Sequence, residues 1–261
     1  MSDALWKWHA ASVQGFDHKE SALPCQDSHA VRTGLGDCVV AIVSDGAGSA
    51  AHSEYGSRLL CDELASSLLA AKEEVPAVNL ALLESLKIRD WIERGIDSVR
   101  AKLVIEARAS DGGLSDFHAT VVGIIADRTG GAFFHIGDGA ALAASSQDLG
   151  LFALSPAENG EYANETFFFT QEEWRSHLRI EKFGPEFDLL ALMSDGVTPI
   201  ALAKGGQSPF APFLEPVSKF LTEADGDGGR AALTELLERE ALRPISGDDK
   251  TLVWIKRSAH D

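Results

Sequence analysis

The chain has 261 residues, and its 45% hydrophobic content allows a sizeable core in one large domain or two small ones. Its 40 acidic and 23 basic residues give a formal charge of −17, which argues against nucleic acid or an anionic membrane surface as the main partner. The sequence shows no signal-peptide pattern, no apolar run of membrane-span length and no zinc-site cysteine spacing. We therefore expect a soluble, cytoplasmic protein without a membrane partner.

Apolar periodicity predicts two strands and then two long helices in the N-terminal part of the chain. Residues 6–14 partly alternate in polarity, and residues 38–44 form a buried, β-branched run. Leucines at helical spacing predict a helix over 51–71, and a second helical tract runs from about Val78 to Ala109. The inner face of the second helix is expected to carry Leu82, Leu86, Trp91, Ile96, Val99 and Leu103.

The rest of the chain predicts an antiparallel meander followed by mixed elements. Residues 118–126 are β-rich, and the turn signal DRTGG at 127–131 leads into two further apolar strands. More strands are predicted at 166–169, 179–183, 188–194 and 250–256, and helices at 209–222 and 229–242. With no linker or repeat, we expect one α+β domain over residues 1–261, built from layered antiparallel sheets covered by helices.

Three apolar runs end on an aspartate that is followed by glycine. VVAIVSDG places Asp45, FFHIGDG places Asp138 and LLALMSDG places Asp195. A carboxylate at the end of a buried strand loses hydration, so it is normally matched by a cation or a metal. No Lys or Arg lies within ten residues of Asp45 or within eight of Asp195. A hard divalent ion would neutralise several carboxylates at once, and the glycines would let a backbone carbonyl approach, so the pattern predicts a metal site.

Two further acidic stretches complete the pattern. PCQDSH at 24–29 contains Asp27, and SGDDKTLVWI at 246–255 places Asp248 and Asp249 immediately before a predicted strand. In this order, the five stretches closely resemble the motifs of the metal-dependent serine/threonine protein phosphatases of the 2C type, in particular a bacterial branch with PCQD in its first motif. The resemblance runs from about residue 9 to residue 256. HATVV at 118–122 is similar to the family segment that has a threonine near the metals, here Thr120.

The resemblance implies a four-layer αββα sandwich, with two antiparallel sheets flanked by helix pairs and two Mg or Mn ions at one end. Asp45 would bridge both ions, the Gly46 carbonyl would bind the second, and Asp195 and Asp248 would bind the first. A metal-bridging water or hydroxide would attack the phosphoryl group in line, without a covalent enzyme intermediate.

Two more aspartates have roles in the same resemblance. Asp27 would hold metal-bound waters, and Asp138 would help to form a third, weaker metal site. The expected cofactors are therefore two ions with a possible third.

The chain departs from the family at three places. Ala47 replaces a histidine that the best-known members have after the first Asp-Gly, a phosphate-binding arginine falls close to Ala22, and Gln26 stands where an acidic residue is common. Substrate phosphate would then rely on the metals or on another cation. The candidates for that cation are Lys19, His18, Arg32 and His52. His52 is also a candidate catalytic residue, together with Asp45, Asp27 and Thr120.

Two hypotheses of function remain. The first is a metal-dependent phosphatase that hydrolyses phosphoserine or phosphothreonine in a protein substrate. A cognate serine/threonine kinase would phosphorylate that substrate. The alternative is a catalytically weak pseudophosphatase that binds a phosphoprotein in regulation, and it is motivated by the missing arginine and histidine. A simple calcium-binding module is disfavoured because the chain has no D-x-D-x-D-G loop with a glutamate at its twelfth position.

Overall fold

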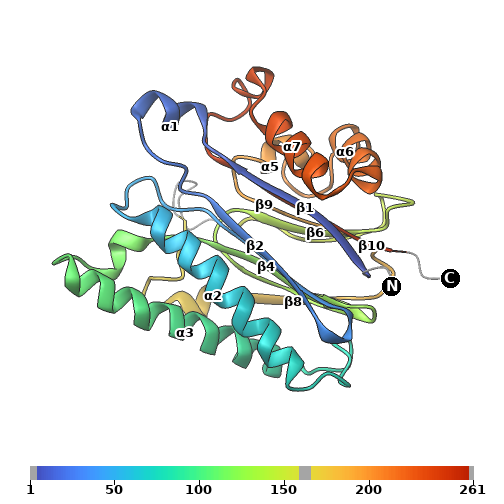
Figure 1. Cartoon of the computed structure of the whole chain (residues 1–261), viewed down its shortest axis with the longest axis horizontal. Coiled ribbons are helices and arrows are strands. Elements are labelled where there is room, and N and C mark those ends of the chain that lie inside the picture. Colours follow the sequence, from blue (N-terminus) through green and yellow to red (C-terminus); the bar gives the residue numbers. More distant parts are fainter. Residues whose placement is uncertain (1–4, 159–165, 259–261) are drawn as a thin grey trace.

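The computed structural model describes residues 5–158 and 166–258, and two antiparallel sheets of five strands each lie face to face in it (Figure 1). The first sheet, called the β1 sheet, has the order β1 (Trp6–Val13), β10 (Lys250–Arg257), β9 (Leu189–Met193), β6 (Ala140–Ala144), β7 (Phe152–Ser155). The second, called the β3 sheet, has the order β2 (Ser28–Gly34), β3 (Cys38–Ser44), β4 (Val121–Asp127), β5 (Gly130–Ile136), β8 (Arg179–Phe183).

Helices cover the outer face of each sheet (Figure 1). Helices α2 (Ser53–Glu73) and α3 (Ser85–Ala109) lie against the β3 sheet, and α6 (Ala211–Glu223) and α7 (Gly226–Leu237) lie against the β1 sheet. Three short helices, α1 (Phe16–Ser21), α4 (Trp174–His177) and α5 (Thr198–Ala201), occur in connections. The expected four-layer α+β sandwich is therefore confirmed.

Strand β3 shows why the apolar run at 38–44 has no polar face. Val39, Ala41 and Val43 point into the core between the two sheets, whereas Val40 and Ile42 point into the core beneath α2 and α3. All seven residues of the strand are buried. Because a middle layer is covered on both sides, both sets of alternating side chains must be apolar.

Several elements differ from the prediction. Strands β2 and β7 and helix α1 were not predicted, and residues 166–169 form an irregular connection rather than a strand. The aromatic side chains of 167–169 instead contact other rings or the core, and the Arg100 guanidinium donates to the carbonyl of Phe169 (2.6 Å). The apolar run at 166–169 therefore reflects the packing of individual side chains and not strand pairing in a sheet.

The second long helix begins at Ser85 instead of about Val78, which changes its inner face. Leu82 lies before the helix and is 79% exposed, and Leu86 lies in its first turn and is 74% exposed, so placing both on the inner face was wrong. Trp91, Ile96, Val99 and Leu103 are buried, as predicted.

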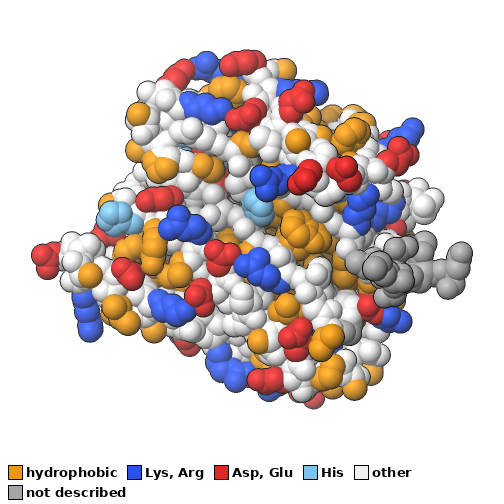
Figure 2. Space-filling model, viewed as in Figure 1, with side chains coloured by type: hydrophobic (Ala, Val, Ile, Leu, Met, Phe, Trp, Pro, Cys, Tyr) orange, Lys and Arg blue, Asp and Glu red, His pale blue; other side chains and the backbone are white. Residues whose placement is uncertain are grey.

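Among the described residues, no helix has both the length and the apolar character needed to cross a membrane. Acidic and basic side chains are interspersed over the face shown in Figure 2, with apolar side chains between them.

Two substitutions in α3 test the corrected face. Leu103→Ala removes a fully buried side chain and is expected to lower the free energy of unfolding by about 2–5 kcal/mol. Leu86→Ala is the matched control, and it should change this free energy by no more than about 0.5 kcal/mol. Urea unfolding followed by circular dichroism measures both, and equal losses would contradict this helix register.

Candidate metal centre

The aspartates predicted at the strand ends meet in one cavity. Asp45 follows β3, Asp138 follows β5, Asp195 follows β9 and Asp248 precedes β10. All four line a cavity of about 450 Å³, together with His18, Thr166, Phe168 and the loop of residues 46–49. Strands from both sheets therefore deliver carboxylates to the same end of the sandwich.

Three of these carboxylates are close enough to share one ion. Asp45, Asp138 and Asp195 each offer an oxygen, and the three oxygens lie within 4.8 Å of one another. One oxygen of Asp138 and one of Asp195 are buried without a hydrogen bond among the described residues. Asp138, predicted as a ligand of a third and weaker site, is thus one of the three closest carboxylates, and the assignment of ions to aspartates stays a prediction.

Asp27 comes directly before β2 and is 5% exposed, and its charge acts on Asp45. Neither of its carboxylate oxygens has a hydrogen-bond partner within residues 5–158 and 166–258. Gln26 is also buried, and its side-chain oxygen has no such partner either. Buried polar oxygens are almost always paired, so unpaired ones indicate a missing ion or water.

The backbone around Asp45 is fixed by the strand that carries Thr120. The Thr120 hydroxyl accepts from the Asp45 amide (3.0 Å), and the Ser44 hydroxyl donates to the Thr120 carbonyl (2.7 Å). Thr120 is buried and does not line the cavity, so it positions Asp45. A Cβ at Gly46 would lie 2.7 Å from the Gln26 carbonyl oxygen, which explains the need for glycine there.

Asp249 was not identified as a site residue from the sequence, yet it joins three segments. Its two oxygens accept from the amides of Gly15 and Gln26, both at 2.6 Å, and His18 Nδ1 lies 2.9 Å from one of them. Asp249 is 1% exposed, so these two backbone donors satisfy a buried carboxylate. The neighbouring Asp248 is exposed and faces the cavity.

Lys250 was also not identified from the sequence. It is 1% exposed, and its Nζ donates to the Asp248 carbonyl (2.8 Å) and lies 5.1 Å from the centre of the Phe16 ring. Burial lowers the pKa of Lys250, and the charges of Asp248 and Asp249 oppose this. The order Asp248-Asp249-Lys250 could have indicated an interaction between these side chains. From sequence alone, however, a lysine next to two aspartates is expected to be exposed to solvent.

The carboxylates raise one another's pKa. Burial, followed by the charges of Asp138 and Asp248, raises the pKa of Asp195 to about 8. Burial is also the main cause that raises the pKa of Asp27 to about 7, and it raises that of Asp45 well above its usual range, with Asp27 the next cause for Asp45. The pocket therefore resists the negative charge that its residues would carry at neutral pH.

The candidate cations separate in the structure. His18 lines the acidic cavity, whereas Lys19 is 3.3 Å from Glu238 and Arg32 is 2.9 Å from Asp62. His52 lines a different cavity and is 5.7 Å from the Phe117 ring, so the structure does not bring it to the aspartates. Of the predicted phosphate-binding side chains, His18 alone is placed beside the carboxylates.

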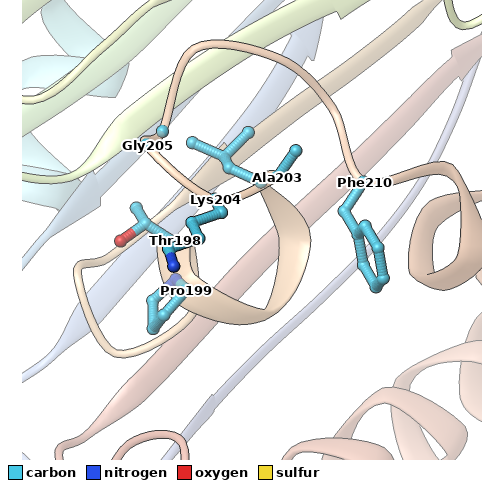
Figure 3. Close-up of a pocket in the computed structure, with 8 residues that line it drawn as sticks. Thr198, Pro199, Ala203, Lys204, Gly205 and Phe210 are labelled. Atoms are coloured by element: carbon cyan, nitrogen blue, oxygen red, sulfur yellow. The ribbon is translucent and has the colours of Figure 1, made fainter.

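A larger cavity, of about 540 Å³, lies beside α5 (Figure 3). Lys204 lies on the same side of it as Thr198 and Pro199 in Figure 3, and Phe210 lies on the other side. Lys204 is the single charged residue among those described as lining it, so this cavity offers no carboxylate for a metal.

The donor set of the acidic cavity fits hard divalent ions. Mg and Mn take carboxylate, carbonyl and water oxygens, and the unpaired oxygens of Asp27, Asp138 and Asp195 are of this kind. That Asp45, Asp195, Asp248 and the Gly46 carbonyl would hold two such ions stays a prediction. A divalent ion would also stabilise the charged carboxylates against the burial and mutual repulsion that raise their pKa values.

The raised pKa values predict how stability depends on pH and on metal. The folded, metal-free protein binds more protons than the unfolded chain between the ordinary aspartate pKa of 3.8 and about 8, so its stability should fall as pH rises through this range. Mn binding needs the deprotonated carboxylates, so the rise in Tm on adding Mn should be larger at about pH 8 than at about pH 5. Differential scanning fluorimetry with and without Mn measures this.

The control for that experiment is Asp195→Asn, which removes one titrating carboxylate and should flatten the pH dependence of the metal-free protein. Equal Mn shifts at both pH values in the wild-type chain would contradict the assignment of these carboxylates as ligands.

Known proteins are similar to this chain in sequence and in fold. A family model described as Protein phosphatase 2C matches residues 14–238. Serine/threonine-protein phosphatase 3 of Escherichia coli (strain K12) is 30% identical over 254 residues, which cover 95% of this chain and 96% of that protein. The resemblance noted from the five acidic motifs is therefore confirmed at the level of the family.

Solved structures are similar in fold at lower identity. A bacterial serine phosphatase superposes with a TM-score of 0.64 at 14% identity, covering 97% of this chain and 98% of that chain. Stp1 from Staphylococcus aureus gives 0.61 at 16% identity, covering 97% and 95% respectively. From the family match and the 30% identical relative, the chain belongs to the protein phosphatase 2C family.

Proposed function

We propose that this protein is a Mg- or Mn-dependent serine/threonine phosphatase. Its substrate would be a cytoplasmic protein that a cognate kinase phosphorylates. Residues 1–261 would form one catalytic domain. The observation that carries the proposal is the convergence of the Asp45, Asp138 and Asp195 oxygens within 4.8 Å, next to buried oxygens that lack hydrogen bonds. The names of the relatives support the substrate class.

Each aspartate has a proposed role. Asp45, the Gly46 carbonyl, Asp195 and Asp248 would together hold two ions, and Asp45 would contribute to both. When bound, two such ions would supply an activated water and a clamp for the phosphoryl oxygens. Asp27 would accept hydrogen bonds from bound waters, because both of its oxygens are buried and unpaired within the described part of the chain.

Asp138 is proposed to serve a third ion. The Thr166 hydroxyl donates to one of its oxygens (2.6 Å), which leaves the other oxygen to face the cavity group. Thr166 itself lines the cavity. One oxygen of Asp138 is therefore already engaged by the protein, which favours a subsidiary role for it.

The substrate phosphate is proposed to contact His18. Its ring is held near the buried Asp249 carboxylate, with Nδ1 at 2.9 Å, and the same residue lines the cavity. Asp249 would orient the ring so that its other nitrogen faces the cavity and can donate to a phosphate oxygen. His18 would thus replace the arginine that the family has near Ala22.

A regulatory pseudophosphatase remains the second candidate. The observation in its favour is that His18 is the only basic side chain among the described residues that line the acidic cavity. The complete set of strand-end aspartates favours the enzyme, because a phosphate-binding site without metal chemistry would not gain from crowded carboxylates.

Substitution of the aspartates tests the function. Mn- or Mg-dependent hydrolysis of an aryl phosphate and of a phosphothreonine peptide should stop with excess EDTA. Asp45→Asn removes charge from both ions and is expected to lower kcat on the order of a thousandfold or more. Asp195→Asn and Asp248→Asn should be partly rescued by high Mn, and Asp138→Asn should keep tight binding of two ions in calorimetry while losing turnover.

Asp111→Asn is the matched control, since Asp111 also precedes a glycine but lies in a turn outside the cavity. Turnover by stripped protein in EDTA would refute the enzyme proposal. Phosphopeptide binding without turnover in Mn would favour the pseudophosphatase, and near-normal kcat for Asp45→Asn would contradict the role of Asp45.

A second prediction concerns phosphate capture. His18→Ala should raise KM by about tenfold with a smaller change in kcat, because it removes a charge-assisted hydrogen bond present in both the bound substrate and the transition state. Lys19→Ala, the neighbouring cation that is directed to Glu238, should leave KM unchanged. Steady-state kinetics with an aryl phosphate distinguishes the two, and an unchanged KM for His18→Ala would reject the assignment.

A further inference from the structure

A separate cavity of about 320 Å³ lies where α2 begins and α3 ends. These two helix ends are at the left of Figure 1. It is lined by the start of α2, by the C-terminal turn of α3 and by Phe117. None of the metal-site aspartates lines it. Residues 114–117, which form a short 3₁₀ helix ending at Phe117, contact both of these helices.

The wall of this cavity is aromatic. Phe117 is 3% exposed, and its ring lies 5.7 Å from His52 and 5.9 Å from Tyr55, the latter edge-on. The Arg58 guanidinium already lies 5.5 Å from the centre of the Tyr55 ring, although Arg58 does not line the cavity. Ring faces within about 6 Å of a cation attract it, so this corner of the fold suits positive charge.

Two carboxylates stand at the same cavity without a cation of their own. Glu54, in the first turn of α2, and Glu106, near the end of α3, both line it. Neither forms an ion pair with a residue that the structure describes. Neighbouring acids on α2 differ, since Glu63 is 2.8 Å from Lys102 and Asp62 is 2.9 Å from Arg32.

The aromatic cavity is connected to the acidic one by short segments. Ala47, Gly48 and Ser49 line the acidic cavity, and five residues along the chain from Ala47, His52 lines the aromatic cavity. Five residues of extended chain span at most about 18 Å, so the two sites lie within the reach of one bound peptide. Next to Phe117, His118 stacks at 4.9 Å on Phe168, which lines the acidic cavity.

We propose that the aromatic cavity binds an arginine or lysine side chain of the phosphoprotein substrate, within about six residues of the phosphorylated position. Three aromatic rings and two unpaired carboxylates are complementary to a guanidinium or ammonium group. The proposal rests on the proposed phosphatase function, and it adds a sequence preference to it. The aryl phosphate used for basal activity carries no such side chain, so its hydrolysis does not depend on this cavity.

Phosphothreonine peptides with a single arginine test the proposal. The arginine is placed in turn at each of the seven positions on either side of phosphothreonine, in a background of alanine and serine. Each peptide has a partner with citrulline in place of arginine, which keeps the shape and removes the charge. For wild-type protein in Mn, arginine is expected to raise kcat/KM about tenfold over citrulline at one position within six residues.

Glu54→Gln with Glu106→Gln should remove this preference and leave aryl phosphate hydrolysis unchanged. Glu63→Gln is the matched control, because it removes the same charge from α2 outside the cavity and should keep the preference. Equal rates for arginine and citrulline peptides at all positions would overturn the proposal. So would an arginine preference that persists in the double variant.

A binding measurement distinguishes failure of the cavity proposal from failure of the phosphatase proposal. Fluorescence anisotropy of the same peptides, with a non-hydrolysable phosphonate in place of phosphate, measures affinity without turnover. A preference for arginine that depends on Glu54 and Glu106 would support the cavity even in a protein without activity. Loss of all hydrolysis with no arginine preference in binding would overturn both proposals.

Discussion

Repulsion among carboxylates at the strand ends is the constraint on which the rest of this structure depends. Asp27, Asp45, Asp138, Asp195 and Asp248 are contributed by both sheets. None of the five forms an ion pair with another described residue. Such a group is held together only if the surrounding structure is rigid, and the three apolar layers of the sandwich supply that rigidity.

The two sheets hold their aspartates in similar ways. In the β3 sheet, the Ser44 hydroxyl donates to the Thr120 carbonyl, and the Asp45 amide donates to the Thr120 hydroxyl. In the β1 sheet, Ser194 accepts from the Thr251 amide through its hydroxyl (2.9 Å) and donates its own amide to the Thr251 carbonyl (3.1 Å), directly before Asp195. A serine before each aspartate thus ties the strand end to its neighbour, so the direction of the carboxylate follows from the backbone.

Much of the centre could be predicted because its signals are local. A buried strand such as β3 or β9 shows as an apolar run, and an aspartate that ends the run is conspicuous in one dimension. By contrast, β2 lies at a sheet edge with only Ala30 and Val31 buried, so its composition resembles a loop. Sequence periodicity therefore finds central strands better than edge strands.

The remaining site residues depend on contacts between distant segments. Asp249 acquires its role from Gly15 and Gln26, more than 200 residues away, and no pattern within its own motif separates it from Asp248. The opposite error occurred at His52, which was predicted to lie at the site as a candidate cation and catalytic residue. The start of α2 instead directs it to Phe117 on the other side of the loop.

The position of β10 within its sheet delays the folding of the chain during its synthesis. Strand β10 lies between β1 and β9, and β1 has no other strand partner in the sheet. Strand β1 must therefore wait until β10, more than 200 residues later in the chain, has been synthesised before its backbone groups are paired. Asp248 and Asp249 directly precede that same strand, so a nascent chain lacks a complete acidic cavity until β10 has been synthesised. Until then the edges of β1 and β9 that pair with β10 stay unpaired.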